Sequence, residues 1–108
     1  MPKTFDEYQE RASSTAIYDS KFSVLYPALG LAGEAGEVAD KVKKIIRDNK
    51  SLVEEKEGIA KELGDVLWYV NAIARDIGYS LEEIAEMNLV KLESRKERGT
   101  LQGNGDNR

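Results

Sequence analysis

Apolar residues recur at steps of three and four along two long stretches of the chain, a spacing typical of amphipathic helices. The first stretch predicts a helix that begins near Pro27, where proline suits a first turn, and ends about Arg47. The second begins after the capping-box pattern of Ser51 and Glu54 and closes at Gly78. The two apolar stripes consist of Leu31, Ala35, Val38, Val42 and Ile45, and of Ile59, Leu63, Val66, Val70, Ala74 and Ile77.

Two shorter helices flank this pair. Thr4 and Glu7 form a capping-box pattern at the start of a helix that we expect to reach about Ala16. Ser80 and Glu83 repeat the pattern before a last helix to about Arg98. Because no window alternates apolar and polar residues, the sequence predicts an all-α fold, a four-helix bundle without a sheet.

The order of these helices indicates how they pack. A short loop joins the two long helices, so we expect them to lie antiparallel with their middles adjacent. Residues 1–98 are predicted to form a single domain, and the Gly- and Asn-rich residues 99–108 a flexible tail. A chain of 108 residues has a modest core and often gains burial by self-association.

The composition narrows the chemistry. The chain has no cysteine and no histidine, which leaves carboxylates for acid–base or metal work and favours Mg²⁺ or Mn²⁺ as an ion. Its net charge of −4 argues against nucleic acid as the main partner. The sequence shows neither an apolar leader nor a membrane-spanning stretch, so we expect a soluble, cytoplasmic protein without a membrane partner.

The same acidic pattern, acid-x-Gly-acid, occurs once in each long helix. Glu34 and Glu37 form the first pair, Glu62 and Asp65 the second. Acids three residues apart share a helix face, with Glu34 and Glu62 nearer the apolar stripe and the other two further round. Carboxylates brought together repel by roughly 4 kcal/mol per pair at about 4 Å and an effective dielectric near 20, which a divalent ion would offset. The alternative is that these acids are solvated helix residues with partners such as Lys41 for Glu37.

Glycines beside the acids add to this prediction, because glycine inside a helix costs about 1 kcal/mol relative to alanine. Gly30 and Gly33 project to the same side as the first acid pair, where they would leave space for a ligand. Gly36 and Gly64 project elsewhere and would permit a close helix crossing.

Other side chains are candidates for holding a substrate. Asn88, Lys91 and Arg95 lie on one face of the last helix, where they could bind phosphates or could simply be solvated near a helix C-terminus. Lys41 and Lys44 are further candidates for phosphate contacts. Aromatic side chains could stack on a base or could be buried in a core or interface. These are Trp68, which lies off its apolar stripe, with Tyr69 and Tyr8.

Three segments, GLAGEAGEVADKVKK, KELGDVLWYV and NLVKLESR, resemble the MazG-type nucleoside triphosphate pyrophosphohydrolases. The likeness covers about residues 5 to 98. It implies an all-α, Mg²⁺-dependent hydrolase that splits nucleoside triphosphates between the α and β phosphates into a monophosphate and pyrophosphate. It also implies a homodimer or homotetramer with sites shared between subunits.

The resemblance assigns roles to particular residues. It implies that Glu34, Glu37, Glu62 and Asp65 bind the metal, with Glu34 orienting the attacking water. A second set, Asn88, Lys91 and Arg95, would contact phosphates. Two alternatives stay open: a non-catalytic oligomeric module that binds other proteins, and a dedicated dCTP or dUTP pyrophosphatase instead of an enzyme that clears noncanonical nucleotides.

Overall fold

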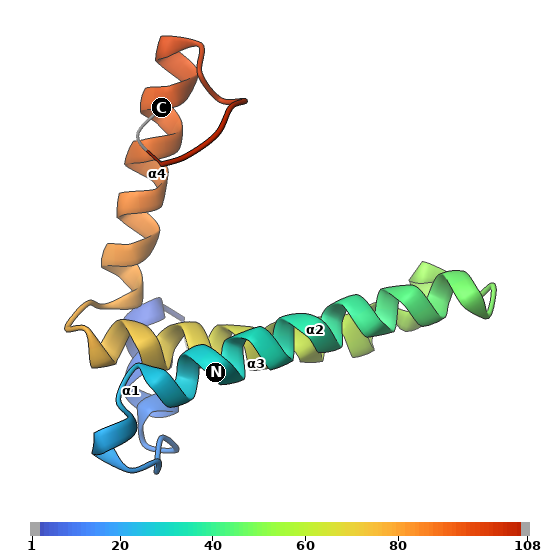
Figure 1. The fold of residues 1–108 in the computed structure, drawn as a ribbon, viewed down its shortest axis with the longest axis horizontal. Helices are drawn as coiled ribbons and strands as arrows, with labels where there is room; N and C mark the ends of the chain where they lie inside the picture. Colours follow the sequence, from blue (N-terminus) through green and yellow to red (C-terminus); the bar gives the residue numbers. More distant parts are fainter. Residues whose placement is uncertain (1–2, 107–108) are drawn as a thin grey trace.

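The computed structural model describes residues 3–106, which form four α-helices and one short 3-10 helix without any β-strand (Figure 1). The elements in chain order are α1 (Phe5–Ser13), η1 (Ser20–Phe22), α2 (Leu25–Arg47), α3 (Leu52–Asp76) and α4 (Leu81–Arg98). The predicted all-α class is confirmed, and the three longer helices lie close to their predicted bounds.

The two long helices, α2 and α3, pack side by side as a hairpin, as their apolar stripes predict (Figure 1). In the turn between them Asn49 takes a left-handed conformation with φ 53°, which asparagine tolerates better than most residues. Further along, the Tyr69 ring lies directly against Gly30, where any side chain would overlap it. Glycine at this position therefore allows the close approach of α2 and α3.

The helix caps agree only in part with the sequence patterns. Ser80 forms a complete capping box with Glu83 at the start of α4. Thr4 accepts a hydrogen bond from the Glu7 N–H at the start of α1, but the Glu7 carboxylate accepts from Lys3 instead of Thr4. The capping box predicted at Ser51 is wrong, since that side chain makes no capping hydrogen bond.

The first helix is shorter than its predicted extent to Ala16, because two hydroxyl groups compete for its last carbonyls. Ser14 donates to the Arg11 carbonyl at 2.7 Å, and Thr15 donates to the Ala12 carbonyl at 2.7 Å. The following α1–α2 connection (residues 14–24) contains η1 and ends at Val24. That residue has φ 66°, a conformation that costs a β-branched residue about 1–3 kcal/mol and needs support from its surroundings.

The last helix, α4, packs against α1 and α3 near its own beginning and then points away from the hairpin (Figure 1). Gln9 fixes this junction: its side chain donates to the Tyr79 carbonyl and accepts from the Leu81 N–H. The four helices therefore form an open arrangement in one chain, and do not close into a bundle.

Few large side chains are buried within this open arrangement. Pro27, Ala72, Ala74 and Leu81 are buried, but Leu29 and Ile46 are each 77% exposed. Other large apolar residues left exposed include Ile17, Leu25, Val53, Met87, Leu89 and Val90. Apolar surface on this scale is typical of a face that contacts another protein molecule.

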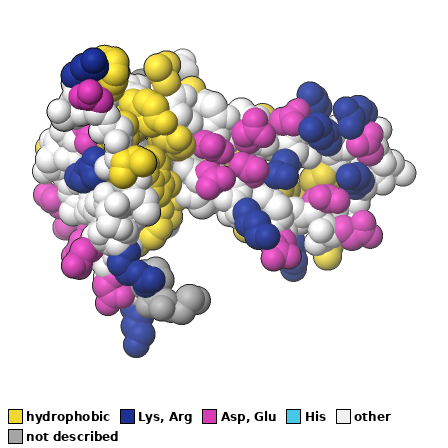
Figure 2. Space-filling model, turned by 90° about the horizontal axis from the view of Figure 1, so that it is seen from below, with side chains coloured by type: hydrophobic (Ala, Val, Ile, Leu, Met, Phe, Trp, Pro, Cys, Tyr) yellow, Lys and Arg dark blue, Asp and Glu magenta, His cyan; other side chains and the backbone are white. Residues whose placement is uncertain are grey.

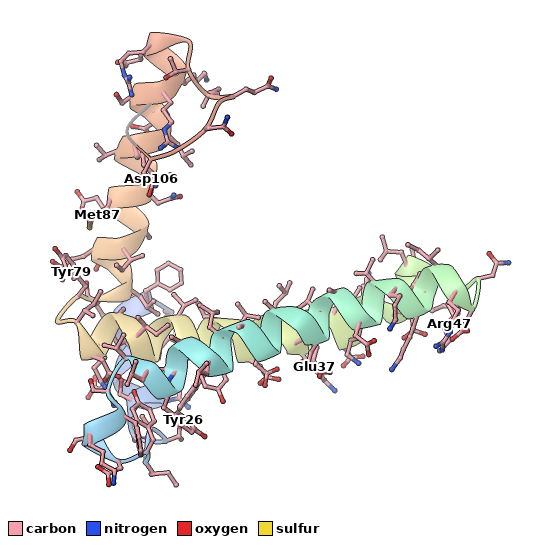
Figure 3. The ribbon with its side chains drawn as sticks, viewed as in Figure 1. Tyr26, Glu37, Arg47, Tyr79, Met87 and Asp106 are labelled. Atoms are coloured by element: carbon pink, nitrogen blue, oxygen red, sulfur yellow. The ribbon has the colours of Figure 1, made fainter. Side chains whose placement is uncertain are left out.

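After α4 the chain turns back at Gly99 (φ 73°), and Asp106 lies beside the helix (Figure 3). The last two residues of the predicted tail, and the first two of the predicted domain, fall outside the described residues. Between residues 3 and 106, no helix combines the length and hydrophobicity that crossing a lipid bilayer requires. The cytoplasmic location stays a prediction.

Candidate metal centre

The middles of α2 and α3 bring three carboxylates together. Glu34, Glu62 and Asp65 each offer an oxygen atom, and these atoms lie within 4.8 Å of one another. Glu34 and Glu62 are half-buried, whereas Asp65 is exposed, which matches their expected positions relative to the apolar stripes. We call these three residues the carboxylate cluster. An all-oxygen group of this size fits Mg²⁺ or Mn²⁺, which bind carboxylates and keep further positions for water or phosphate.

Glu37 lies outside the carboxylate cluster. It is exposed on α2, between Tyr26 and Arg47, which occupy opposite ends of the helix (Figure 3). Its charge still reaches the cluster, because it contributes to the raised pKa of Glu34. One chain therefore brings together three of the four predicted ligands, with the fourth near enough to act electrostatically.

Electrostatic strain centres on Glu34. Partial burial raises the pKa of Glu34, and the negative charges of Asp65, Glu62 and Glu37 raise it further. Each ionised neighbour thus makes another negative charge here less favourable. A cation among the carboxylates would remove this repulsion.

Of the two lysine candidates on α2, only Lys41 reaches the carboxylate cluster. Its ammonium group lies 3.9 Å from Glu62, so it pairs across the hairpin and not with Glu37 on its own helix. Lys44 instead lies 2.9 Å from Asp40, four residues earlier on the same helix. Hydrogen bonds from Lys44 and Lys43 lower the pKa of Asp40 to about 2.

An aromatic wall borders the cluster. Trp68 and Tyr69 meet edge to face with ring centroids 5.0 Å apart, and they line a hollow of 290 Å³ together with Glu34 and Asp65. Figure 2 shows the acidic side chains midway along the hairpin, between a hydrophobic patch and the lysines and arginines of the far end. On this face the acidic side chains thus lie next to the hydrophobic patch.

A second hollow of 390 Å³ adjoins the first and shares Trp68 and Tyr69 with it. Its opposite side includes Tyr18 and Tyr26, whose rings stack with centroids 5.1 Å apart. We call these two hollows the aromatic cavity. Sequence reasoning missed Tyr18 and Tyr26, because the residues around the start of α2 show no periodic pattern that would single them out.

Besides Tyr69, the aromatic candidates Trp68 and Tyr8 also lie near the carboxylates. Trp68 is half-buried, and its indole N–H donates to Thr15 at 2.8 Å. Tyr8 is also half-buried; burial raises its pKa, and the charge of Asp65 raises it further. Trp68 and Tyr8 share a separate hollow of 600 Å³ on the α1 side.

The glycine predictions need correction. The space beside Gly30 is filled by the Tyr69 ring and is not left for a ligand. A Cβ atom at Gly33 would meet nothing within 4 Å, so that side of α2 is open as expected. Gly36 and Gly64 are open too, so they do not lie at a close helix crossing within this chain.

The three phosphate candidates on α4 do not lie beside the carboxylate cluster in the same chain, because α4 points away from the hairpin (Figure 1). Asn88 is exposed. Lys91 pairs with Asp106 at 3.1 Å, and the largely buried Arg95 donates to the Asp106 carbonyl at 2.8 Å. The hydrogen bond and charge of Lys91 lower the pKa of the Asp106 carboxyl, and a longer contact of 3.5 Å from Arg95 to the same carboxylate oxygen lowers it further.

Comparison with known proteins finds a matching family and a similar phage protein. Residues 23–100 match the family model described as the MazG nucleotide pyrophosphohydrolase domain. The chain is also 48% identical over 111 residues to the Gene 37 protein of Mycobacterium phage L5, across 95% of this chain and 97% of that protein. No solved structure matches the chain significantly.

Proposed function

Because the chain belongs to the MazG nucleotide pyrophosphohydrolase domain family, we propose that it hydrolyses nucleoside triphosphates between the α and β phosphates. The products are a nucleoside monophosphate and pyrophosphate, and the reaction depends on Mg²⁺. One observation supports this most directly: Glu34, Glu62 and Asp65 converge from two helices beside an aromatic cavity.

In this proposal the carboxylate cluster holds Mg²⁺, with Mn²⁺ as a substitute, and Glu37 completes the set of ligands. A bound ion of this kind neutralises charge on the phosphates and lowers the pKa of a bound water. Among the glutamates of the cluster, Glu34 lines the hollow shared with Trp68 and Tyr69. In the proposal it orients the attacking water and accepts its proton.

The surroundings suggest how the substrate lies. Trp68 and the tyrosines of the aromatic cavity offer faces for stacking on a base. Tyr8 lies beside Trp68 in the neighbouring hollow on the α1 side. Lys41 lies on the other side of the carboxylates, where its charge can offset that of the phosphates. We therefore propose that the base occupies the aromatic cavity and that the phosphates extend along the hairpin towards Lys41.

We further propose that two or more chains share each site. A homodimer or homotetramer would cover the exposed apolar residues of α2 and α4 and close the open arrangement of helices. It would also allow Asn88, Lys91 and Arg95 of one chain to approach the carboxylate cluster of another. Lys91 and Arg95 would then exchange their contacts with Asp106 for phosphate oxygens.

Incubation with ribo- and deoxynucleoside triphosphates and Mg²⁺ tests the proposed reaction. We expect pyrophosphate release from at least one of them, with turnover that disappears in EDTA. Release of orthophosphate alone would contradict cleavage between the α and β phosphates. No turnover of any triphosphate would favour the non-catalytic protein-binding module. The same panel separates a broad nucleotide clean-up enzyme from one dedicated to dCTP or dUTP.

A further inference from the structure

A buried carboxylate at the end of α3 fastens the α1–α2 connection to the hairpin. The Asp76 side chain is only 7% exposed, and one of its oxygens accepts two hydrogen bonds from that connection. The Tyr18 hydroxyl donates at 2.7 Å, and the Val24 backbone N–H donates at 2.9 Å. Asp76 lies outside the carboxylate cluster and has no role in the proposed reaction so far.

Both donors help to position one wall of the aromatic cavity. Tyr18 stacks on Tyr26, so the hydrogen bond from Tyr18 to Asp76 fixes the position of both rings. Val24 is the residue with φ 66° at which the chain enters α2, two positions before Tyr26. A strained residue keeps its conformation only where neighbouring contacts hold it, and the bond to Asp76 is such a contact.

Arg75, the neighbour of Asp76, strengthens the same attachment. Its guanidinium donates to the Ser13 carbonyl at 3.3 Å and to the Tyr18 hydroxyl at 3.2 Å, and it lies 5.9 Å from the centre of the Tyr18 ring. Together with the bond from Trp68 to Thr15, these contacts fix both ends of the connection on α3. One wall of the aromatic cavity is therefore positioned by the C-terminal end of α3.

We propose that Asp76 is a positioning residue for nucleotide binding: it holds Tyr18 and Val24 so that the Tyr18–Tyr26 stack forms the wall of the cavity that receives the base. This inference rests on the proposed function. It separates two tasks along α3, since Glu62 and Asp65 would hold the metal ion for the phosphates while Asp76 would act on base recognition. Loss of Asp76 should therefore weaken substrate binding more than it slows the chemical step.

The chain offers a matched control. Asp48 follows Arg47 at the end of α2, as Asp76 follows Arg75 at the end of α3. It is exposed, however, and its carboxylate accepts two hydrogen bonds from the Arg47 guanidinium. Asp76→Asn and Asp48→Asn thus make the same chemical change at equivalent helix ends. Tyr18→Phe is a second test, since it keeps the ring and removes only the hydroxyl bond to Asp76.

Three measurements are made on each variant after its helical circular dichroism is checked. The first is kcat and KM for the triphosphate turned over fastest. The second is the Kd of nucleoside triphosphate analogues with a methylene bridge between the α and β phosphorus atoms, which cannot be hydrolysed there. The third is acrylamide quenching of Trp68, the single tryptophan, whose indole is bonded to the connection.

For Asp76→Asn we expect KM and the analogue Kd to rise about tenfold, the scale of losing hydrogen bonds to a charged group. We expect kcat to stay within about twofold and Trp68 to be quenched more readily. Tyr18→Phe should shift in the same direction by less, and Asp48→Asn should match the wild type. If Asp76→Asn fails to fold, the Tyr18→Phe result decides.

Unchanged KM and Kd in folded Asp76→Asn and Tyr18→Phe would overturn the inference, as would a fall in kcat with KM unchanged. A wild-type protein that binds the analogues but hydrolyses no triphosphate would refute the proposed reaction, while the analogue Kd values would still decide the role of Asp76. A wild-type protein that binds none of the analogues would overturn the inference.

Discussion

Glu34 on α2 and Asp65 on α3 present carboxylate oxygens within 4.8 Å of each other, although they come from different helices. Partial burial raises the pKa of Glu34, and repulsion from the negative charge of Asp65 raises it further. The hairpin supports this arrangement through packing elsewhere, such as Tyr69 against Gly30.

The first prediction concerns Mg²⁺ and stability. At a free concentration a hundredfold above its Kd, an ion bound only by the folded protein stabilises it by about 2.7 kcal/mol. We expect Mg²⁺ to raise the unfolding temperature of the wild type and to have little effect on Asp65→Asn. In EDTA, Asp65→Asn should unfold at a higher temperature than the wild type, because repulsion with Glu34 is relieved.

Glu37→Gln should weaken the binding of Mg²⁺ less than Asp65→Asn does, because Glu37 lies outside the carboxylate cluster. Glu57→Gln on α3 is the control, since that residue is 83% exposed and pairs only loosely with Lys61. Isothermal titration gives the affinities. Equal losses of Mg²⁺ affinity in Glu37→Gln and Asp65→Asn would contradict this prediction and would show that the site is complete only with a second chain.

A second prediction tests the packing of the hairpin. Gly30→Ala should lower the free energy of unfolding by about 1–3 kcal/mol, because the new methyl group overlaps the Tyr69 ring. Gly36→Ala is matched in chemistry and meets nothing within 4 Å, so it should raise that energy by about 0.5–1 kcal/mol through helix propensity. Urea denaturation of both variants measures whether each substitution lowers or raises the free energy of unfolding.

The pH dependence of stability gives a third prediction. Burial alone would raise the pKa of Asp76, but hydrogen bonds from Val24, Tyr18 and Arg75 outweigh it and lower the pKa below the ordinary 3.8. A carboxylate with a lowered folded-state pKa contributes stability above about pH 3.8, which is lost as the pH falls through the folded value.

Asp76→Asn should therefore be less stable than the wild type by about 1–3 kcal/mol at pH 7, and this difference should shrink below pH 4. Urea unfolding of both proteins at a series of pH values measures it. A difference that stays constant down to pH 2 would contradict the role of the ionised Asp76 carboxylate.

A fourth prediction concerns self-association. Size-exclusion chromatography with light scattering should give a mass of at least two chains, since one chain leaves apolar residues such as Leu29 exposed. Mixing inactive Asp65→Asn with inactive Lys91→Ala should restore part of the activity if sites are shared, because some sites then have both wild-type residues. A fully active monomer would contradict the shared site.

The sequence predicted much of this fold because helix periodicity and termini are local properties. The stripes from Leu31 and Ile59 placed α2 and α3, and the acid spacing placed Glu34 and Glu62 at the edges of those stripes. The direction of α4 could not be predicted, since it depends on contacts such as Gln9 with Leu81, far apart in the sequence. The tertiary partners of Asp76 could not be predicted from the sequence for the same reason.

The most direct test of the account is ³¹P NMR of the products formed from a nucleoside triphosphate and Mg²⁺ by the wild type and by Asp65→Asn. The account predicts equal amounts of monophosphate and pyrophosphate from the wild type, and no products from a folded Asp65→Asn variant. Diphosphate with orthophosphate from the wild type, or full activity in Asp65→Asn, would contradict it.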